Sequence, residues 1–224
     1  MQGVSIGHSS RYPKNTKRCR YEMKEIRAFE FEVRAEENEK GKVLTGQPIV
    51  FNARTNLGFW DEIIENTALT DTDLKDVRFL INHNTDMIPL ARSRNNNANS
   101  TMQLEVVPEG MNIRVNLDTE NNSEARALYS AVERGDISGM SFMFSVKEDA
   151  WDDVNTEHPT RHIRSIERIL EVSAVTFPAY AQTSITARGL DEALENAKSS
   201  LENERARLAD IELRKEQIRL MLEV

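Results

Sequence analysis

The sequence predicts a mainly β protein with flanking helices, in the α+β class, followed by a long C-terminal helix. Three observations predict this class. Segments in which apolar and polar residues alternate recur from residue 26 onward, and such alternation indicates strands with one buried face. Before residue 177, only residues 123–134 show apolar residues at helical spacing over several turns. Beyond Arg188, apolar residues return every three or four positions among Glu, Lys and Arg, which predicts a long helix with a narrow apolar seam.

The first two predicted strands lie at residues 26–34 and 43–51. The first alternates cleanly, and the second contains Gly46 and Pro48, which suggest a bulge or an edge position. The charged segment 36–42 between them is expected to be a turn. We therefore expect the two strands to form a hairpin.

The next region is predicted to contain one strand between shorter pieces. Residues 59–64 are amphipathic and are expected to cover one end of a sheet, whereas residues 70–77 predict one helical turn after cap-like Thr and Asp residues. Residues 77–83 predict a compact strand with its odd-numbered residues, including His83, on one face. Residues 94–101, rich in Asn and Ser, predict a solvated loop.

The clearest hairpin joins residues 102–107 to residues 111–117 across a Pro-Glu-Gly turn. A helix is predicted at residues 123–134, with Ser123 as its cap and Gly135 as its stop. This helix leads directly into the glycine- and serine-containing segment that follows it.

Two further strands complete the predicted β region. The first is residues 139–146, and the second is residues 163–177, which contain the most continuous apolar run of the chain and end before Pro178. The polar, acidic residues 147–161 between them are expected to be a hairpin tip.

The two ends differ from the middle, which predicts a division into three parts. Residues 1–22 are basic and polar and predict a flexible arm. Residues 23–188 are expected to form the folded β domain. Residues 189–224 predict a helix that serves as a coiled coil or docks on a partner, with a helix that folds back on its own domain as the alternative.

Composition excludes several classes of protein. A net charge of −8 over 224 residues, with 29% charged residues, indicates a soluble acidic protein rather than a nucleic-acid binder. No run approaches the roughly 18 apolar residues of a membrane span, and residues 1–22 lack the apolar region of a signal peptide. The single cysteine, Cys19, excludes a disulfide framework within the chain and is a poor candidate nucleophile. We therefore expect cytoplasmic residence.

A serine at the start of a strand is the strongest candidate for chemistry. Ser141 follows Gly139 and Met140, where small residues would let a substrate backbone approach closely. Ser138 and Ser145 are rivals: Ser138 belongs to the preceding turn, and Ser145 lies further along the strand on the same face as Ser141. Serine chemistry also needs a base, a group that orients the base, and donors for the oxyanion.

His83, at the end of its predicted strand, is the candidate base. His8 lies in the basic arm, and His158 and His162 lie in the polar hairpin tip, so all three are weaker candidates. A metal site built from the last two histidines and neighbouring carboxylates is conceivable, the carboxylates being Asp152, Asp153 or Glu157. No regular element supports that spacing, so we predict no metal and no cofactor.

Glu171 is the candidate orienting group. It is a carboxylate within an apolar run, and a buried carboxylate is costly unless it is paired. The alternative is an exposed position on an edge strand. Backbone amides, Arg92 or Arg94 could supply the oxyanion donors.

Several motifs in order resemble the prohead maturation proteases of tailed bacteriophages, which are related to the herpesvirus assemblins. The resemblance covers about residues 24–188. It rests on the following segments in this order: Ile26-Arg27-Ala28-Phe29; Phe79-Leu80-Ile81-Asn82-His83; Pro89-Leu90-Ala91-Arg92; Ile137-Ser138-Gly139-Met140-Ser141-Phe142-Met143-Phe144; and Leu170-Glu171-Val172-Ser173-Ala174-Val175-Thr176-Phe177-Pro178-Ala179.

The resemblance implies a serine endopeptidase on a small closed assemblin-like β-barrel flanked by helices. His83 and Ser141 match the family's histidine and serine. Assemblins use a second histidine as the third member, and no comparable histidine occurs here, so Glu171 takes that role in our interpretation.

The resemblance also implies a setting and partners. Such proteases are packed inside the immature capsid, or prohead, in the host cytoplasm. They cleave scaffold or major capsid protein and also themselves. The expected partners are therefore these substrates and further copies of the chain, through autocleavage or through the C-terminal helix, with no membrane and no specific nucleic acid.

Two alternatives belong to different functional classes. In the first, the chain is a non-enzymatic capsid assembly or scaffold protein that acts through its coiled-coil helix. In the second, it is a β-barrel binding module without a capsid role.

Overall fold

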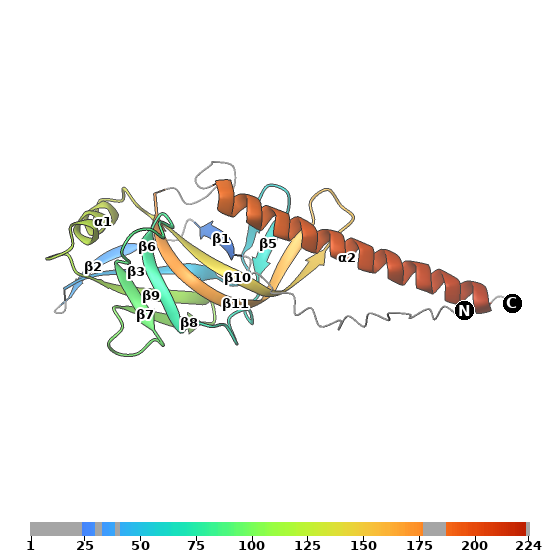
Figure 1. Cartoon of the computed structure of the whole chain (residues 1–224), viewed down its shortest axis with the longest axis horizontal. Coiled ribbons are helices and arrows are strands. Elements are labelled where there is room, and N and C mark those ends of the chain that lie inside the picture. The colour runs from blue at the N-terminus through green and yellow to red at the C-terminus, as the bar shows by residue number, and fades with distance from the viewer. Residues whose placement is uncertain (1–23, 30–32, 39–40, 177–186, 223–224) are drawn as a thin grey trace, which may run out of the picture.

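The structure is a computed structural model that describes residues 24–29, 33–38, 41–176 and 187–222 (Figure 1). The strands in these ranges form two sheets. The larger sheet has the order β1 (Lys24–Phe29), β10 (Gly139–Asp152), β11 (Thr160–Val175), β5 (Asp61–Ile64) and β4 (Arg54–Asn56), with β6 (Asp76–Ile81) also on β11 and β7 (Ala91–Arg94) on β6. The smaller sheet has the order β2 (Arg34–Asn38), β3 (Gly41–Val50), β9 (Gly110–Leu117) and β8 (Met102–Val107).

The long antiparallel hairpin of β10 and β11 is the central element of the larger sheet (Figure 1). Both strands are longer than predicted, because charged residues beyond Val146 continue the ladder as far as the pair Asp152–Thr160. The predicted tip at residues 147–161 is therefore wrong in extent, and only residues 153–159 lie outside the strands. Charge did not end these strands because Lys147, Glu148 and Asp152 face solvent, whereas the buried Arg161 pairs with Asp149.

The predicted N-terminal hairpin is wrong in its pairing. β1 pairs antiparallel with β10, whereas β3 pairs with β2 and β9. The charged residues assigned to a turn form most of β2, in which Glu36 pairs with Val43. The sequence carries no local signal for pairing between segments more than 100 residues apart. The hairpin of β8 and β9 has a short turn between its strands, and its pairing was predicted correctly.

Two short segments also differ from the prediction. Residues 61–64 form β5, a strand that pairs in parallel with β11 rather than covering the end of a sheet. The α-helical turn predicted at residues 70–77 is absent. These residues form hydrogen-bonded turns, an isolated bridge from Asp73 to Arg168, and the start of β6. Backbone pairing with β11 thus prevails over the cap-like residues of this segment.

α1 (Ser123–Glu133) confirms the predicted helix, with a small shift at its start. The N-cap is Asn122, whose side-chain oxygen accepts hydrogen bonds from the N–H groups of Glu124 and Ala125. Gly135 follows the end of the helix with φ +79°, a conformation that glycine adopts without steric cost. The chain then turns directly into β10.

Apolar side chains from both sheets and from α1 form the main core. Its largest fully buried members include Phe79, Phe142 and Phe144. Within the described residues no strand ladder joins one sheet to the other, so the predicted closed barrel is not confirmed. Because Phe142 and Phe144 point into this core, the odd-numbered residues of β10 lie on the opposite face of the sheet, which we call the outer face.

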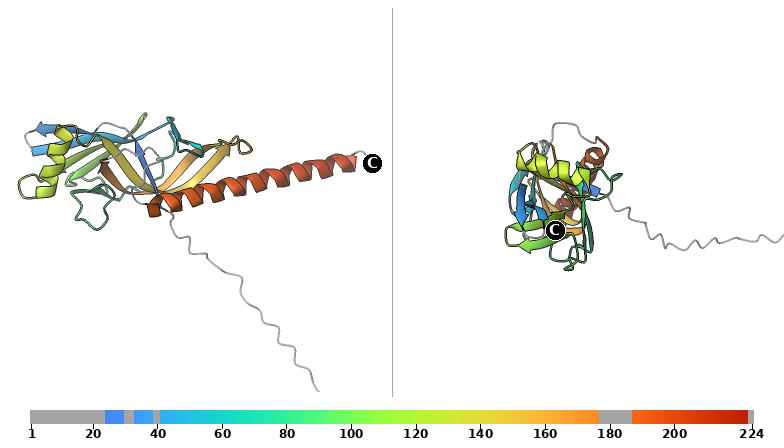
Figure 2. Two further views of the ribbon diagram at one scale, coloured as in Figure 1. Left: turned by 90° about the horizontal axis from the view of Figure 1, so that it is seen from above. Right: turned by 90° about the vertical axis from the view of Figure 1, so that its left-hand side faces the viewer.

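α2 (Ala187–Leu222) is one long helix that runs past the end of the sheets (Figure 2). Leu194, Ala197, Leu201 and Leu208 pack against a second apolar cluster that contains Trp60, Trp151 and Val154. The first half of the apolar seam therefore folds back on its own domain, the alternative in the prediction. In the second half Leu213, Ile218 and Leu222 are exposed, so this part remains available for docking.

Buried charges join β1 to the middle of the larger sheet. The Arg27 guanidinium donates hydrogen bonds to Glu62 at 2.5 and 2.7 Å and to Glu25 at 2.6 Å. Arg161 contacts both carboxylates and also Asp149. Burial alone would raise the pKa of the Glu25 carboxyl, but the charges of Arg27 and Arg161 outweigh burial and lower that pKa.

Within the described ranges, no helix is long and apolar enough to cross a membrane.

Gly110→Ala is expected to lower the free energy of unfolding by about 3 kcal/mol or more, because overpacking a tight site typically costs ~1–3 kcal/mol even when side chains can move. Here a Cβ atom at position 110 would lie 1.9 Å from the Ile49 carbonyl oxygen. This oxygen belongs to the backbone of β3, which is hydrogen-bonded to β9 and therefore cannot shift as easily as a side chain. Urea denaturation measures the change. Gly41→Ala is the matched control, because Gly41 also has a positive φ but no atom lies within 4 Å of its added Cβ. An equal loss of unfolding free energy in both variants would contradict the steric explanation.

Candidate active site

β10 places Ser141 on the outer face of the larger sheet. Met140 and Phe142 on either side of it point into the core, so alternation along the strand turns Ser141 the other way. Ser141 is fully buried and stands directly opposite Ser173 in the ladder with β11.

β11 contributes two further polar side chains to the same face. Val172 and Ala174 are core residues, so Glu171 and Ser173 point outward. Both are buried, and the Ser173 hydroxyl donates a hydrogen bond of 2.5 Å to Glu171 Oε2. The carboxylate therefore has a fixed orientation on the face that also carries Ser141, opposite Met143 in the ladder.

His83 reaches this face from the end of β6. The strand ends at Ile81, and Asn82 and His83 follow with φ +50° and +56°, values that are uncommon outside glycine. The predicted alternation, which placed His83 on the face of Phe79, is therefore wrong. The left-handed backbone turns the imidazole onto the face of Glu171 instead.

Two contacts fix His83 in this position. The imidazole Nδ1 lies 2.5 Å from Glu171 Oε1, with 11% of the histidine side chain and 3% of the glutamate side chain exposed. The His83 backbone N–H donates to Ser173 Oγ at 3.1 Å. Because an ionised carboxylate can only accept, the proton of this contact belongs on Nδ1, which leaves Nε2 free to act as a base.

β11 is the strand that brings the three candidate residues together. It pairs with β6 on one side and with β10 on the other, so His83 and Ser141 flank the strand that carries Glu171. Neighbouring strands lie about 4.8 Å apart, so the backbones of His83 and Ser141 are about two strand spacings apart, and each side chain has to reach across the strand between them. A base held by a carboxylate beside a serine hydroxyl is the arrangement that serine nucleophiles require.

Ser141 does not contact His83 in this structure. Its hydroxyl donates a hydrogen bond of 2.8 Å to the backbone carbonyl of Arg27 on β1, and no hydrogen bond between Ser141 and His83 is present among the described residues. The serine and the histidine–glutamate pair thus share one face, with the hydroxyl turned toward the neighbouring strand.

Comparison with known proteins identifies the relationship. The family model of the caudovirus prohead serine proteases matches residues 29–198, about three quarters of the chain. The chain belongs to this family. A search of curated proteins and a search of solved structures gave no match. Family membership supports a serine protease with a role in phage capsid maturation.

The other serines that the sequence offered lie away from His83. In this member of the family Ser138 lies in the turn before β10, where its carbonyl accepts a hydrogen bond from the N–H of Val33. Ser145 lies on the outer face four residues after Ser141 on the same strand, and it is 1% exposed. Neither contacts the histidine in the structure.

The other two histidines within the described residues, His158 and His162, make separate contacts. His158 lies 2.9 Å from Asp61, and His162 lies 3.2 Å from Asp152 and 3.4 Å from Glu65. In the described part of the chain, no three His, Cys, Asp or Glu side chains are grouped to hold a metal ion. His8 and Cys19, with the rest of the basic arm, lie outside the described residues.

Arg92, a candidate oxyanion donor, is engaged with another residue. It donates hydrogen bonds of 2.6 and 2.8 Å to Asp76, and these bonds lower the pKa of the Asp76 carboxyl, assisted by the charge of Arg78. Arg92 lies on β7, three strands away from β10, and Arg94 is exposed on the same strand. The structure brings neither arginine to Ser141.

Ser173 is the site residue that the sequence analysis missed. It contacts both Glu171 and His83 and faces Ser141. The signal was present, since residues two apart on a strand share a face, and Ser173 lies two positions after Glu171.

Proposed function

We propose that the protein is a serine endopeptidase in which Ser141 is the nucleophile, His83 the general base and Glu171 the orienting carboxylate. The observation that carries this proposal is the contact of 2.5 Å between His83 Nδ1 and Glu171 Oε1 on the face that also holds Ser141. Family membership supports the serine chemistry, and the geometry supports these residues for it.

The mechanism begins with a change of partner by the Ser141 hydroxyl, from the Arg27 carbonyl to His83 Nε2. Oγ then attacks the carbonyl carbon of the scissile peptide while its proton passes to Nε2. Glu171, which accepts from Nδ1–H, stabilises the imidazolium that forms. A tetrahedral intermediate results, with its negative charge on the former carbonyl oxygen.

The intermediate collapses when His83 returns the proton to the leaving nitrogen, so that the C–N bond breaks and an ester to Ser141 remains. A water molecule then attacks this ester with His83 again as the base. The Ser141 proton is restored, and the second product leaves with a new carboxylate.

The proposed setting is the immature capsid in the host cytoplasm, and the proposed substrates are scaffold protein, major capsid protein and the chain itself. Family membership supports this setting. We propose that residues 23–188 form the protease domain, that the first half of α2 completes its fold, and that the exposed second half docks on a partner or on another copy of the chain.

Labelling with a fluorophosphonate, followed by mass mapping of the modified peptide, tests the proposal. We expect one adduct, on Ser141, that is lost in Ser141→Ala and strongly reduced in His83→Ala. Labelling on Ser138 or Ser145 would contradict the choice of nucleophile. An unlabelled protein that also leaves scaffold and capsid protein intact during co-expression would favour the non-enzymatic assembly role.

A further inference from the structure

Ser173 lies between two residues of the candidate site, and it has no part in the proposed mechanism. Its hydroxyl donates a hydrogen bond of 2.5 Å to Glu171 Oε2 and accepts one of 3.1 Å from the backbone N–H of His83. The side chain is fully buried. A hydroxyl has a single proton to donate, so the proton of Ser173 is committed to the carboxylate while its oxygen holds the backbone of the base.

The strand ladder shows what the bond to Glu171 does. Ser173 stands opposite Ser141, whereas Glu171 stands opposite Met143, one cross-strand pair farther along the hairpin. Residues two apart on a strand are separated by about 6.8 Å. A hydrogen bond of 2.5 Å between the side chains of Glu171 and Ser173 therefore means that the carboxylate leans along β11, toward the part of the face that carries Ser141.

A competing partner for the carboxylate stands on β6. Arg78 is directly opposite Glu171 in the parallel ladder, and its two neighbours on the strand are core residues, so its side chain lies on the outer face as well. Arg78 pairs with Asp76 at 3.2 Å with 42% of its side chain exposed, and pairs this exposed are weak. Because a guanidinium binds a carboxylate strongly, a pair between Arg78 and Glu171 would draw the carboxylate away from His83.

The second bond of Ser173 acts on the backbone of the base. Asn82 and His83 both have positive φ, a conformation that costs free energy and persists only where the surroundings hold it. The bond from the His83 N–H to Ser173 Oγ is one contact that holds this turn. The Asn82 side chain supplies another, since it exchanges hydrogen bonds with Thr176 beyond the end of β11.

We propose that Ser173 is a positioning residue of the candidate site, which directs the Glu171 carboxylate toward His83 and away from Arg78 and also holds the left-handed turn of His83. This inference rests on the proposed function, because it takes His83 as the base that activates Ser141. Ser173 acts through these residues and takes no proton from Ser141, so its loss weakens the base without removing it.

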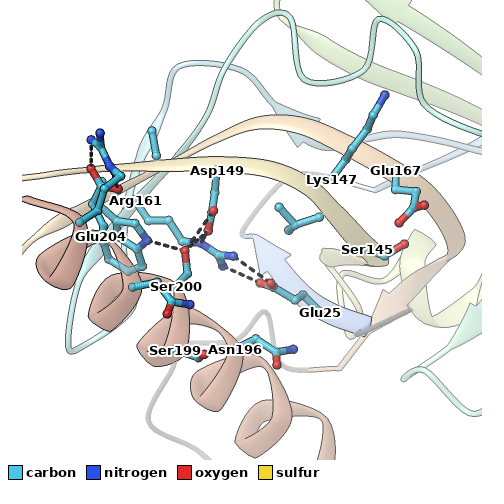
Figure 3. Close-up of a pocket in the computed structure, with 15 residues that line it drawn as sticks. Glu25, Ser145, Lys147, Asp149, Arg161, Glu167, Asn196, Ser199, Ser200 and Glu204 are labelled. Carbon is cyan, nitrogen blue, oxygen red and sulfur yellow. Dashed lines mark hydrogen bonds and ion pairs between the residues drawn. The ribbon is translucent and has the colours of Figure 1, made fainter. Parts of the chain in front are cut away.

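A serine elsewhere in the molecule makes the same two kinds of contact (Figure 3). Ser200 of α2 donates a hydrogen bond of 3.0 Å to Asp149 and accepts one of 3.0 Å from Trp151 Nε1. It therefore also joins a carboxylate to an N–H group. Asp149 stands opposite the core residue Ile163, so Ser200 lies on the core side of the larger sheet. Ser200→Ala is thus the matched control for Ser173→Ala.

The rate at which a fluorophosphonate labels Ser141 in the full-length protein tests the inference. We expect Ser173→Ala to lower this rate about ten- to a hundredfold, the scale of one hydrogen bond to a charged group, and Ser200→Ala to leave it unchanged. Adding Arg78→Met to Ser173→Ala should recover part of the rate, because the competing cation is gone. In a Glu171→Gln background Ser173→Ala should cost less than in the wild type, because residues that act as one unit are not additive.

NMR of protein with 15N-labelled histidine separates positioning from a general loss of structure. The ring nitrogens report which of them carries the proton, and the His83 signals are assigned from their loss in His83→Gln. Because Glu171 accepts from Nδ1–H, neutral His83 should be the Nδ1–H tautomer in the wild type. Ser173→Ala should show a mixture with the Nε2–H tautomer, and Ser200→Ala should show the wild-type spectrum.

Unchanged labelling of Ser141 together with an unchanged tautomer of His83 in Ser173→Ala would overturn the inference. Slower labelling with an unchanged tautomer and no recovery from Arg78→Met would overturn it too, because the effect would then be structural. An adduct on Ser173 would make that residue a nucleophile instead. Absence of any adduct in the wild type would overturn the proposed function, and the tautomer in Ser173→Ala would still decide whether Ser173 positions His83.

Discussion

Ser141→Ala is expected to lower kcat/KM for cleavage of scaffold or capsid protein by at least about a thousandfold, the scale of loss when a serine nucleophile is removed. The cost in stability should be near 1 kcal/mol, because the variant loses one hydrogen bond, from Oγ to the Arg27 carbonyl. Mass analysis of the cleavage products and urea denaturation measure the two effects separately.

His83→Ala should cause a similar loss, and the double variant should lose little more than either single variant, because residues that act as one unit are not additive. Ser138→Ala is the control, since Ser138 lies in the turn before β10 and, among the described residues, its backbone carbonyl is the group that accepts a hydrogen bond. A tenth or more of the wild-type rate in Ser141→Ala would show that another group is the nucleophile.

Arg161→Met is expected to lower the free energy of unfolding by about 3–5 kcal/mol, because removing one partner of a buried ion pair leaves uncompensated charge. Arg161 is 3% exposed and contacts Glu25, Glu62 and Asp149. Arg161→Lys should recover only part of the loss, since an ammonium cannot reproduce the planar fork of donors. Urea denaturation of the three proteins measures the difference.

Arg54→Met is the matched control for this prediction. Arg54 also pairs with one carboxylate, that of Asp61, but 60% of its side chain is exposed. Exposed pairs contribute ~0–1 kcal/mol, so this variant should keep nearly full stability. Similar losses in Arg54→Met and Arg161→Met would show that burial of the cluster is not what stabilises it.

The parts of the fold that the sequence predicted are those with local signals. The hairpin of β8 and β9 has its turn within a few residues, and α1 has a cap at one end and Gly135 at the other. The pairing of β1 with β10 has no such signal, because Ala28 and Ser141 are more than 100 positions apart. The sequence pattern indicated that these strands exist but not which strands they contact.

The candidate site shows the same limit at the scale of single residues. Glu171 was predicted to orient the base because it is a carboxylate in an apolar run, and in the structure it contacts His83. The direction of His83 could not be predicted, because alternation fails where Asn82 and His83 adopt positive φ. Nor could the contact of Ser141 with Arg27 be predicted, because it depends on which strand becomes the neighbour of β10.

That contact has a consequence for the kinetics of the proposed enzyme. In the proposed mechanism, the hydroxyl of Ser141 exchanges the Arg27 carbonyl for His83 by rotation about its own Cα–Cβ bond. If this exchange costs about 1 kcal/mol, the scale of one hydrogen bond, the attack-ready rotamer is populated at about one part in six. Rotamer exchange is fast on the scale of turnover, even when burial slows it beyond the picosecond-to-nanosecond range of exposed side chains. The resting rotamer would then reduce the cleavage rate only several-fold. Any much stronger inhibition before the capsid closes would therefore have to limit how the substrate reaches the site.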